Sequence, residues 1–151
     1  PGLRCLLMMR SVLHYFGMKG LRPVLAHLRR QLLPGEYFVH QSASFLKQDD
    51  ADCLNELYDL MGTQKWYPTI GCLNEAMAET GWRVVQTETA PALPLDYADL
   101  FDRYRFDRQR VEAYCRRLCG RNDLSEEVFR ATPDGCRFFL HYRIYVCTPQ
   151  D

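Results

Sequence analysis

The sequence has no excess of charge, no long apolar run and no paired cysteine motif, and each absence excludes a class of protein. Its 151 residues hold 19 Lys plus Arg and 19 Asp plus Glu, so no net field attracts nucleic acid or anionic lipid. No apolar run approaches the ~18 residues that a membrane span needs, and the first residues lack the layout of a signal peptide. We therefore expect a cytoplasmic protein that binds neither nucleic acid nor membrane.

The seven cysteines are scattered and lack the C-x-x-C spacing of zinc sites and disulfide frameworks, which favours a reducing compartment. Cys115 and Cys119 stand four residues apart on a predicted helix and could present two thiolates to one metal ion. No histidine or second thiol pair accompanies them, so we predict no metal site. A G-x-G-x-x-G segment is also missing, and Gly17 to Gly20 lacks the strand-loop-helix context of a nucleotide-binding loop.

A βαβ unit is present in the first 39 residues. Residues 3–12 (LRCLLMMRSV) are apolar without the alternation of a half-exposed strand, which is typical of a parallel strand covered on both faces. The next apolar residues recur at helical spacing and predict a helix that packs on a sheet. They are Leu21, Val24, Leu25, Leu28 and Leu32. A second buried strand follows over residues 37–39.

The rest of the chain continues this alternation. Helices are predicted around residues 49–61 and, with Thr69 as the N-cap and Gly81 just past the end, around residues 70–80. A strand follows over residues 82–88, and a final strand is predicted over residues 136–146. Residues 90–135, with helices at 96–104 and 107–119, are predicted to form a helical insertion in a single domain of residues 1–151.

In this order the elements resemble the C-terminal half of a class I S-adenosylmethionine-dependent methyltransferase of the small-molecule type. The resemblance rests on four segments: SVLHYF (11–16), LLPGEYFVHQ (32–41), WYPTIGCLNEAMAETGWRVVQTE (66–88) and RFFLHYRIYVC (137–147). It implies an α/β fold with a partial Rossmann-like sheet of two parallel strands plus a C-terminal antiparallel strand pair, flanked by helices. It also implies that the final strand lies between the second and third strands.

In that family the glycine-rich cofactor loop and the ribose-binding acid belong to the first two strands, which the resemblance does not cover. It therefore implies the acceptor-side half of a methyltransferase that acts on a small molecule, with an incomplete site for S-adenosyl-L-methionine. We expect the strand at Leu3–Met9 to lie at the sheet edge and to pair with a missing N-terminal half, a second chain or a homodimer partner. The alternative is a non-catalytic, methyltransferase-like interaction module that binds its partner through this strand.

Ligands of open parallel sheets bind outside the carboxyl ends of the strands. By the resemblance, Arg10 and Ser11 match cofactor-facing positions, and His14 and Tyr15 match substrate-facing ones. Methyl transfer needs alignment more than strong acid or base chemistry, and a histidine that titrates near neutrality suits the role of proton acceptor. His14 is therefore a candidate catalytic residue. The structural alternative is that it caps the next helix.

The end of the second strand and the following aromatic bend supply the other candidates. His40 is a second candidate base, with Gln41 beside it for substrate binding, although His40 could equally hydrogen-bond the strand end. Trp66 and Tyr67 could cover a small apolar acceptor or simply lock the start of the next helix. His141 lies in the middle of the predicted final strand, where we expect a structural role.

Overall fold

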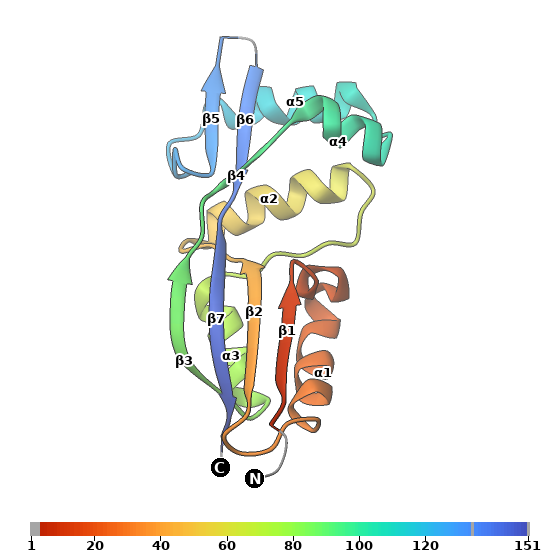
Figure 1. Cartoon of the computed structure of the whole chain (residues 1–151). Coiled ribbons are helices and arrows are strands. Elements are labelled where there is room, and N and C mark those ends of the chain that lie inside the picture. The colour runs from red at the N-terminus through yellow and green to blue at the C-terminus, as the bar shows by residue number, and fades with distance from the viewer. Residues whose placement is uncertain (1–3, 134, 151) are drawn as a thin grey trace.

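The computed structural model describes residues 4–133 and 135–150 (Figure 1). In chain order, its elements are β1 (Leu6–Arg10), the 3-10 helix η1 (Leu13–Phe16), α1 (Gly17–Arg29), β2 (Tyr37–Ala43), α2 (Gln48–Leu60), α3 (Ile70–Glu79), β3 (Trp82–Thr89), β4 (Leu93–Leu95), α4 (Tyr97–Tyr104), α5 (Arg108–Leu118), β5 (Phe129–Thr132), β6 (Gly135–Leu140) and β7 (Tyr142–Pro149).

Four of the strands form one sheet in the order β1-β2-β7-β3. β1 pairs with β2 in parallel, and β7 runs antiparallel to both β2 and β3. The prediction that the last strand is antiparallel and lies between the second and third strands is confirmed. β1 lies at the edge, as predicted, although Leu3 falls outside the described residues.

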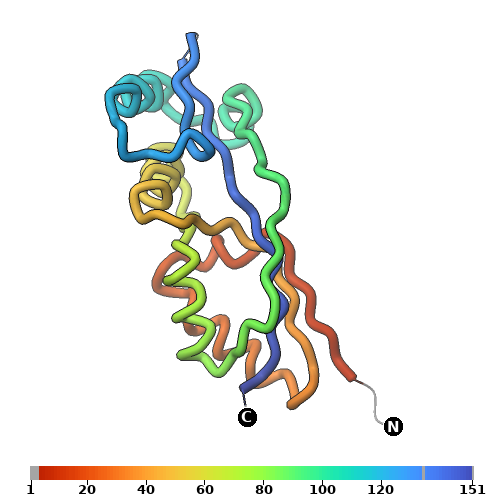
Figure 2. The backbone as a smooth tube through the Cα atoms, turned by 90° about the vertical axis from the view of Figure 1, so that its left-hand side faces the viewer, coloured from red at the N-terminus to blue at the C-terminus, as the bar shows by residue number. Residues whose placement is uncertain are grey.

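One face of this sheet is covered by α1 and α3, which lie on the same side of it (Figure 2). The predicted apolar stripe of α1 is confirmed for Leu21 and Leu25, which are buried, but α1 ends at Arg29 and Leu32 lies beyond it. α3 adds Leu73 and Met77 to the same core. Trp82, at the start of β3, joins it and donates its indole N–H to the carbonyl oxygen of Leu25 at 3.0 Å. Burial of this apolar surface therefore holds the two helices on the sheet.

The opposite face of β1 is not covered by any described residue. Leu6 and Met8 are 58% and 72% exposed, whereas Leu7 and Met9 point to the helix side and pack against the core. The prediction that this strand is covered on both faces is therefore wrong for the described part of the chain. An apolar run alone cannot distinguish a strand with two covered faces from one whose second face is open.

A second lobe is built mostly from residues 93–140. Its sheet has the order β4-β6-β5, and α2, α4 and α5 pack around it (Figure 1). The helices expected in the insertion are present, with Asp96 and Asp107 as N-caps of α4 and α5. The segment also supplies β4 and β5, which the sequence analysis did not predict. Leu93–Leu95 is short and contains a proline, so only its pairing with β6 identifies it as a strand.

The single final strand predicted over residues 136–146 is wrong, because the chain passes from one sheet to the other at His141. β6 ends at Leu140 and β7 begins at Tyr142. The His141 carbonyl oxygen accepts from the Ser44 amide at 3.0 Å. The His141 Nε2 lies 2.7 Å from the Glu127 carbonyl oxygen. His141 therefore sits at a junction and not inside a strand.

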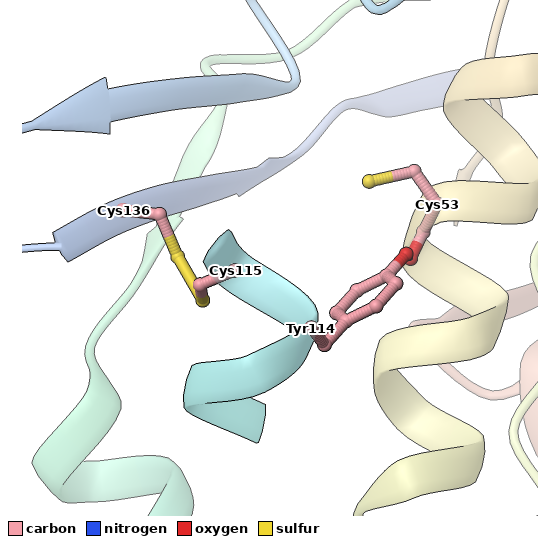
Figure 3. Close-up of a disulfide and its surroundings, with 4 residues drawn as sticks. All are labelled: Cys53, Tyr114, Cys115 and Cys136. Carbon is pink, nitrogen blue, oxygen red and sulfur yellow. A yellow bond between two sulfur atoms is a disulfide. The ribbon is translucent and has the colours of Figure 1, made fainter. Parts of the chain in front are cut away.

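A disulfide joins Cys115 of α5 to Cys136 of β6 (Figure 3). The two Cα atoms are 6.0 Å apart, and 21 positions separate the residues in sequence. Beside it, the Tyr114 hydroxyl donates to the Cys53 carbonyl oxygen at 2.8 Å and ties α5 to α2. The bridge is at odds with the reducing compartment expected from the scattered cysteines, and their spacing could not predict it, because it depends on the tertiary packing of the second lobe. In the described part of the chain, no helix has both the length and the apolarity to cross a membrane.

Candidate functional site

A cavity of about 290 Å³ lies between the carboxyl end of β1 and the second lobe. Its first wall comes from the segment that follows β1, from α2 and from the loop that follows α2. These residues are Ser11, His14, Tyr15, Tyr58, Lys65 and Tyr67. The second wall comes from β4, α4 and the β6–β7 junction. Its residues include Leu95, Asp96, Asp99, Arg103, Tyr104, Leu140 and Tyr142.

Ser11 turns the chain away from the sheet at the end of β1. Its φ of 53° lies in the left-handed region, which a non-glycine residue seldom adopts. The Ser11 amide donates to the Gln41 carbonyl oxygen at 2.9 Å, so the last rung of the parallel ladder holds this turn. The turn directs η1 across the carboxyl end of the sheet and places His14 and Tyr15 on the cavity wall.

His14 is a buried residue of this wall, with only 8% of its surface exposed. Its ring lies 4.3 Å from the Tyr15 ring and 5.1 Å from the Tyr67 ring, measured between centroids, and no described residue forms a hydrogen bond with its Nε2. Burial lowers the pKa of His14 to about 4, and the nearby Lys65 ammonium contributes to the decrease. The imidazole is therefore neutral at pH 7, but it is a much weaker base than the near-neutral histidine that the sequence analysis expected.

Lys65 places an ammonium among three tyrosine rings. Its Nζ lies 4.9 Å from the ring centroid of Tyr15, 5.2 Å from that of Tyr58 and 5.0 Å from that of Tyr104. It also donates a hydrogen bond to the Tyr104 hydroxyl. The aromatic faces attract the cation and fix its position, as cation–π contacts do.

Tyr67 is held in place by Asn55 of α2. The Asn55 side chain donates to the Tyr67 carbonyl oxygen at 2.9 Å and accepts from the Tyr67 amide at 2.7 Å. Burial raises the pKa of both Tyr67 and Tyr58 well above the ordinary value. The Tyr67 hydroxyl donates to the Tyr58 hydroxyl, so the O–H of Tyr58 is the one left to donate to a ligand.

The structure brings four of the predicted site residues to this cavity: Ser11, His14, Tyr15 and Tyr67. Arg10, Gln41 and Trp66 do not line it. Arg10 ends β1 as an exposed residue, and Gln41 lies within β2, where its carbonyl oxygen holds Ser11. Trp66 packs against the core beneath the sheet, so it does not cover this cavity.

The position predicted for His40, just past the strand end, is wrong. β2 continues to Ala43 because Gln41, Ser42 and Ala43 still pair with β7. His40 is therefore fully buried between the rings of Phe38 and Tyr145, each centroid 4.9 Å away. Burial lowers its pKa to about 3. This enclosure leaves His40 without contact to the cavity.

Most of the lining was missed by sequence reasoning, including Tyr58, Lys65 and Tyr104. The position of Tyr58 on an apolar helix face predicts only a core residue. Lys65 is a single charged residue before the aromatic bend. Tyr104 comes from α4, whose contact with the main sheet's rim depends on how the second lobe packs. Periodicity predicts α4 but carries no information about that contact.

No protein-family model matches the sequence, and no curated protein sequence is significantly similar to it. Solved structures are similar. A putative methyltransferase from Bacillus halodurans superimposes with a TM-score of 0.78 at 10% identity, over 97% of this chain and 70% of that one. The YcgJ protein from Bacillus subtilis gives 0.72 at 13%, over 97% and 64%. The cyclopropane synthase MmaA2 from Mycobacterium tuberculosis gives 0.52 at 15%, over 95% and 55%.

These similarities show the fold, which is the Rossmann-like α/β fold of class I methyltransferases. The chain nevertheless spans only 64% of the Bacillus subtilis structure and 55% of the cyclopropane synthase. It shares only the fold with these proteins, because at 10–15% identity individual residues cannot be matched between them.

The described residues do not furnish an adenosyl site for S-adenosylmethionine. Such a site needs a backbone that approaches the ligand closely, typically where a glycine leaves space that a Cβ would fill. Among the described glycines, an added Cβ at Gly17 would meet only the Gln64 carbonyl oxygen, at 3.6 Å, and the space beside Gly62 is open. Neither forms a cradle, so a segment outside the described residues would have to hold the adenosyl group.

Proposed function

We propose that this chain, which has the class I methyltransferase fold, is the acceptor-side half of an S-adenosylmethionine-dependent methyltransferase of small molecules. The observation that carries the proposal is the cavity at the carboxyl end of β1, where ligands of open α/β sheets bind. It joins His14 and Tyr15 to an aromatic second lobe. A cavity of this size accommodates a small acceptor.

The chain's own residues then bind and orient the acceptor. S-adenosylmethionine, when bound, supplies an electrophilic methyl group, so the acceptor needs alignment and a place for its proton. In this proposal His14 accepts that proton only when the bound acceptor reaches its enclosed Nε2 and raises its low pKa, and Tyr15 and Tyr67 form the wall beside it. Arg10 and Ser11, at the end of β1, face the methionine portion of the cofactor in this proposal.

The cofactor half pairs with the free edge of β1. Among the described residues β1 pairs only with β2, and Leu6 and Met8 leave apolar surface exposed beside that edge. A free strand edge of this kind is a template for pairing with another strand. In this proposal the glycine-rich half of the enzyme occupies it, supplied by the same polypeptide, by a second chain or by a homodimer partner.

Titration calorimetry of the 151-residue chain with S-adenosylmethionine tests the proposal. We expect no saturable binding to this chain alone, and binding once a glycine-rich strand-loop-helix segment is present. Tight binding by the chain alone would contradict the proposal that the cofactor half is supplied separately. The coding sequence immediately upstream of Pro1 provides a second test, because a glycine-rich strand-loop-helix encoded there supports the enzyme.

The second candidate function is a non-catalytic interaction module, and the same exposed edge of β1 favours it. Leu6 and Met8 would then pack against a protein partner, and a net charge of zero suits such a partner better than a nucleic acid. A start codon immediately upstream of Pro1 favours the module. Methyl transfer by the complete protein would exclude it as the sole function.

A further inference from the structure

The cavity contains an ammonium that is held in place but lacks an acidic partner. Three aromatic faces and the Tyr104 hydroxyl surround the Lys65 Nζ. Only one of the three N–H donors of the ammonium is used by the hydroxyl. Within the described residues, no carboxylate lies within 4.0 Å of it. Because these contacts already restrict the rotamers of Lys65, the side chain loses little further conformational entropy when a ligand binds.

The other polar groups of the cavity are mixed, since they include donors and a second cation but also two carboxylates that oppose an anion placed beside them. The Tyr58 hydroxyl, which accepts from Tyr67, can donate its own O–H, and Arg103 adds a second cation to the lining. Asp96 and Asp99 also line the cavity. The Asp96 carboxylate accepts from the Asp99 amide at 3.0 Å as the N-cap of α4, and neither acid forms an ion pair with Lys65 or Arg103.

We propose that the cavity binds a small planar aromatic carboxylate, whose anionic oxygens accept hydrogen bonds from Lys65 and whose ring packs on Tyr15. This ligand is the methyl acceptor if the proposed function holds. Tyr15 is 61% exposed and offers a free aromatic surface next to the ammonium. A volume of about 290 Å³ suits a single ring with its substituents. The ammonium repels a cationic ligand of the same size and gives a neutral one no charge-assisted hydrogen bond.

Three probes that differ mainly in charge test the proposal on the 151-residue chain: 4-hydroxybenzoate, its neutral methyl ester and the cationic 4-hydroxybenzylamine. Binding is followed by calorimetry and by chemical-shift changes of backbone amides. We expect saturable binding of the carboxylate, with shifts at Tyr15, Lys65 and Tyr104. Affinities for the ester and the amine should be weaker by roughly 10- to 100-fold, the value of one charge-assisted hydrogen bond. Equal or tighter binding of the amine would overturn the proposal.

Variants of Lys65 test whether its positive charge is responsible for binding the carboxylate. Lys65→Met keeps most of the side-chain volume and should weaken binding of 4-hydroxybenzoate by roughly 10- to 100-fold. Lys65→Arg keeps the charge and should stay within a few-fold of the parent. Lys19→Met, on the exposed surface of α1, is the matched control and should bind like the parent. Unchanged affinity in a folded Lys65→Met protein would sink the proposal, and thermal denaturation confirms that each variant is folded.

The experiment separates this inference from the proposed function, because the binding assay needs no cofactor. Carboxylate binding through Lys65, without methyl transfer by the complete protein, would refute the methyltransferase and leave the binding site standing. Methyl transfer to a cationic or neutral acceptor that is preferred over the carboxylate would refute the binding site and leave the enzyme standing.

Discussion

The imidazole of His14 packs against the ring of Tyr67, with centroids 5.1 Å apart and ring planes inclined by 37°. Tyr67 is itself fixed, because it is buried and its backbone is bonded on both sides to Asn55. The Trp66 amide also donates to the His14 carbonyl oxygen at 3.0 Å. The aromatic bend therefore locks His14 in one orientation and keeps water from its Nε2, which accounts for the low pKa of the imidazole.

Stability should fall as the pH drops below about 6.5. The pKa values of folded His14 and His40, about 4 and about 3, lie below the ordinary value of 6.5, so the unfolded chain binds protons first. The free energy of unfolding is then fully present above pH 6.5 and decreases as the pH falls toward 4. His14 alone contributes about 3 kcal/mol to this decrease. Urea denaturation between pH 7 and pH 4.5 measures it.

The contribution of His14 can be isolated in two variants. His14→Gln should reduce the pH dependence of the free energy of unfolding by the contribution of His14. The contribution of His40 should remain. Lys65→Met should raise the pKa of His14 in an NMR titration, while leaving it below 6.5 because burial is the larger cause. A His14 imidazole that titrates near 6.5 in the parent protein would show that the ring is not enclosed as described.

His14→Ala tests the catalytic role in the complete enzyme. If His14 accepts the acceptor's proton, kcat should fall by roughly 10²- to 10⁴-fold. Because the ring is buried between two tyrosines, we also expect a stability loss of about 1–3 kcal/mol, so turnover must be measured where the variant is folded. His27→Ala is the control, since His27 lies on the exposed surface of α1, outside the cavity, and the variant should leave kcat unchanged. A destabilised but fully active His14→Ala enzyme would remove His14 from the site.

Local signals in the sequence predicted α3, α4 and α5 and their N-caps well, whereas α1 ends at Arg29, earlier than predicted, and α2 begins without a side-chain cap. Thr69 caps α3 by accepting from the Cys72 amide at 3.1 Å, and Gly81 has the φ of 84° that a residue just past a helix end requires. Both features depend only on neighbouring residues. The position of β7 in the sheet followed from the family resemblance, which supplies a strand order that periodicity alone cannot.

Features that depend on distant residues were not predictable in this way. β2 extends past His40 only because β7, about a hundred residues later, continues to pair with it. The cavity likewise joins Tyr15, Lys65 and Tyr104, which come from three separate parts of the sequence. Such contacts arise from the packing of the second lobe on the rim. No hydrophobic period or cap encodes them.

Reduction of the Cys115–Cys136 disulfide should destabilise the second lobe. Closing a loop of 21 residues restricts the unfolded chain and stabilises the fold by about 3 kcal/mol. Urea denaturation with and without dithiothreitol measures the loss, and Cys115→Ser should reproduce it. Exposed Cys119→Ser is the control and should leave stability nearly unchanged. In the denatured but unreduced protein, thiol titration should detect five cysteines, and detection of all seven would contradict the bridge.

The exposed face of β1 should control association of the chain. Leu6 and Met8 face solvent beside the free edge, whereas Leu7 points to the core. Changing both Leu6 and Met8 to Lys should therefore suppress self-association or partner binding, measured by analytical ultracentrifugation, without loss of the fold, because charges on an edge strand oppose pairing. Leu7→Lys, on the same strand, should instead lower the stability by about 2 kcal/mol or more, because it brings a charge into an apolar environment. A parent chain that remains monomeric at high concentration and binds no glycine-rich half would contradict the proposal that this edge is covered in the working protein.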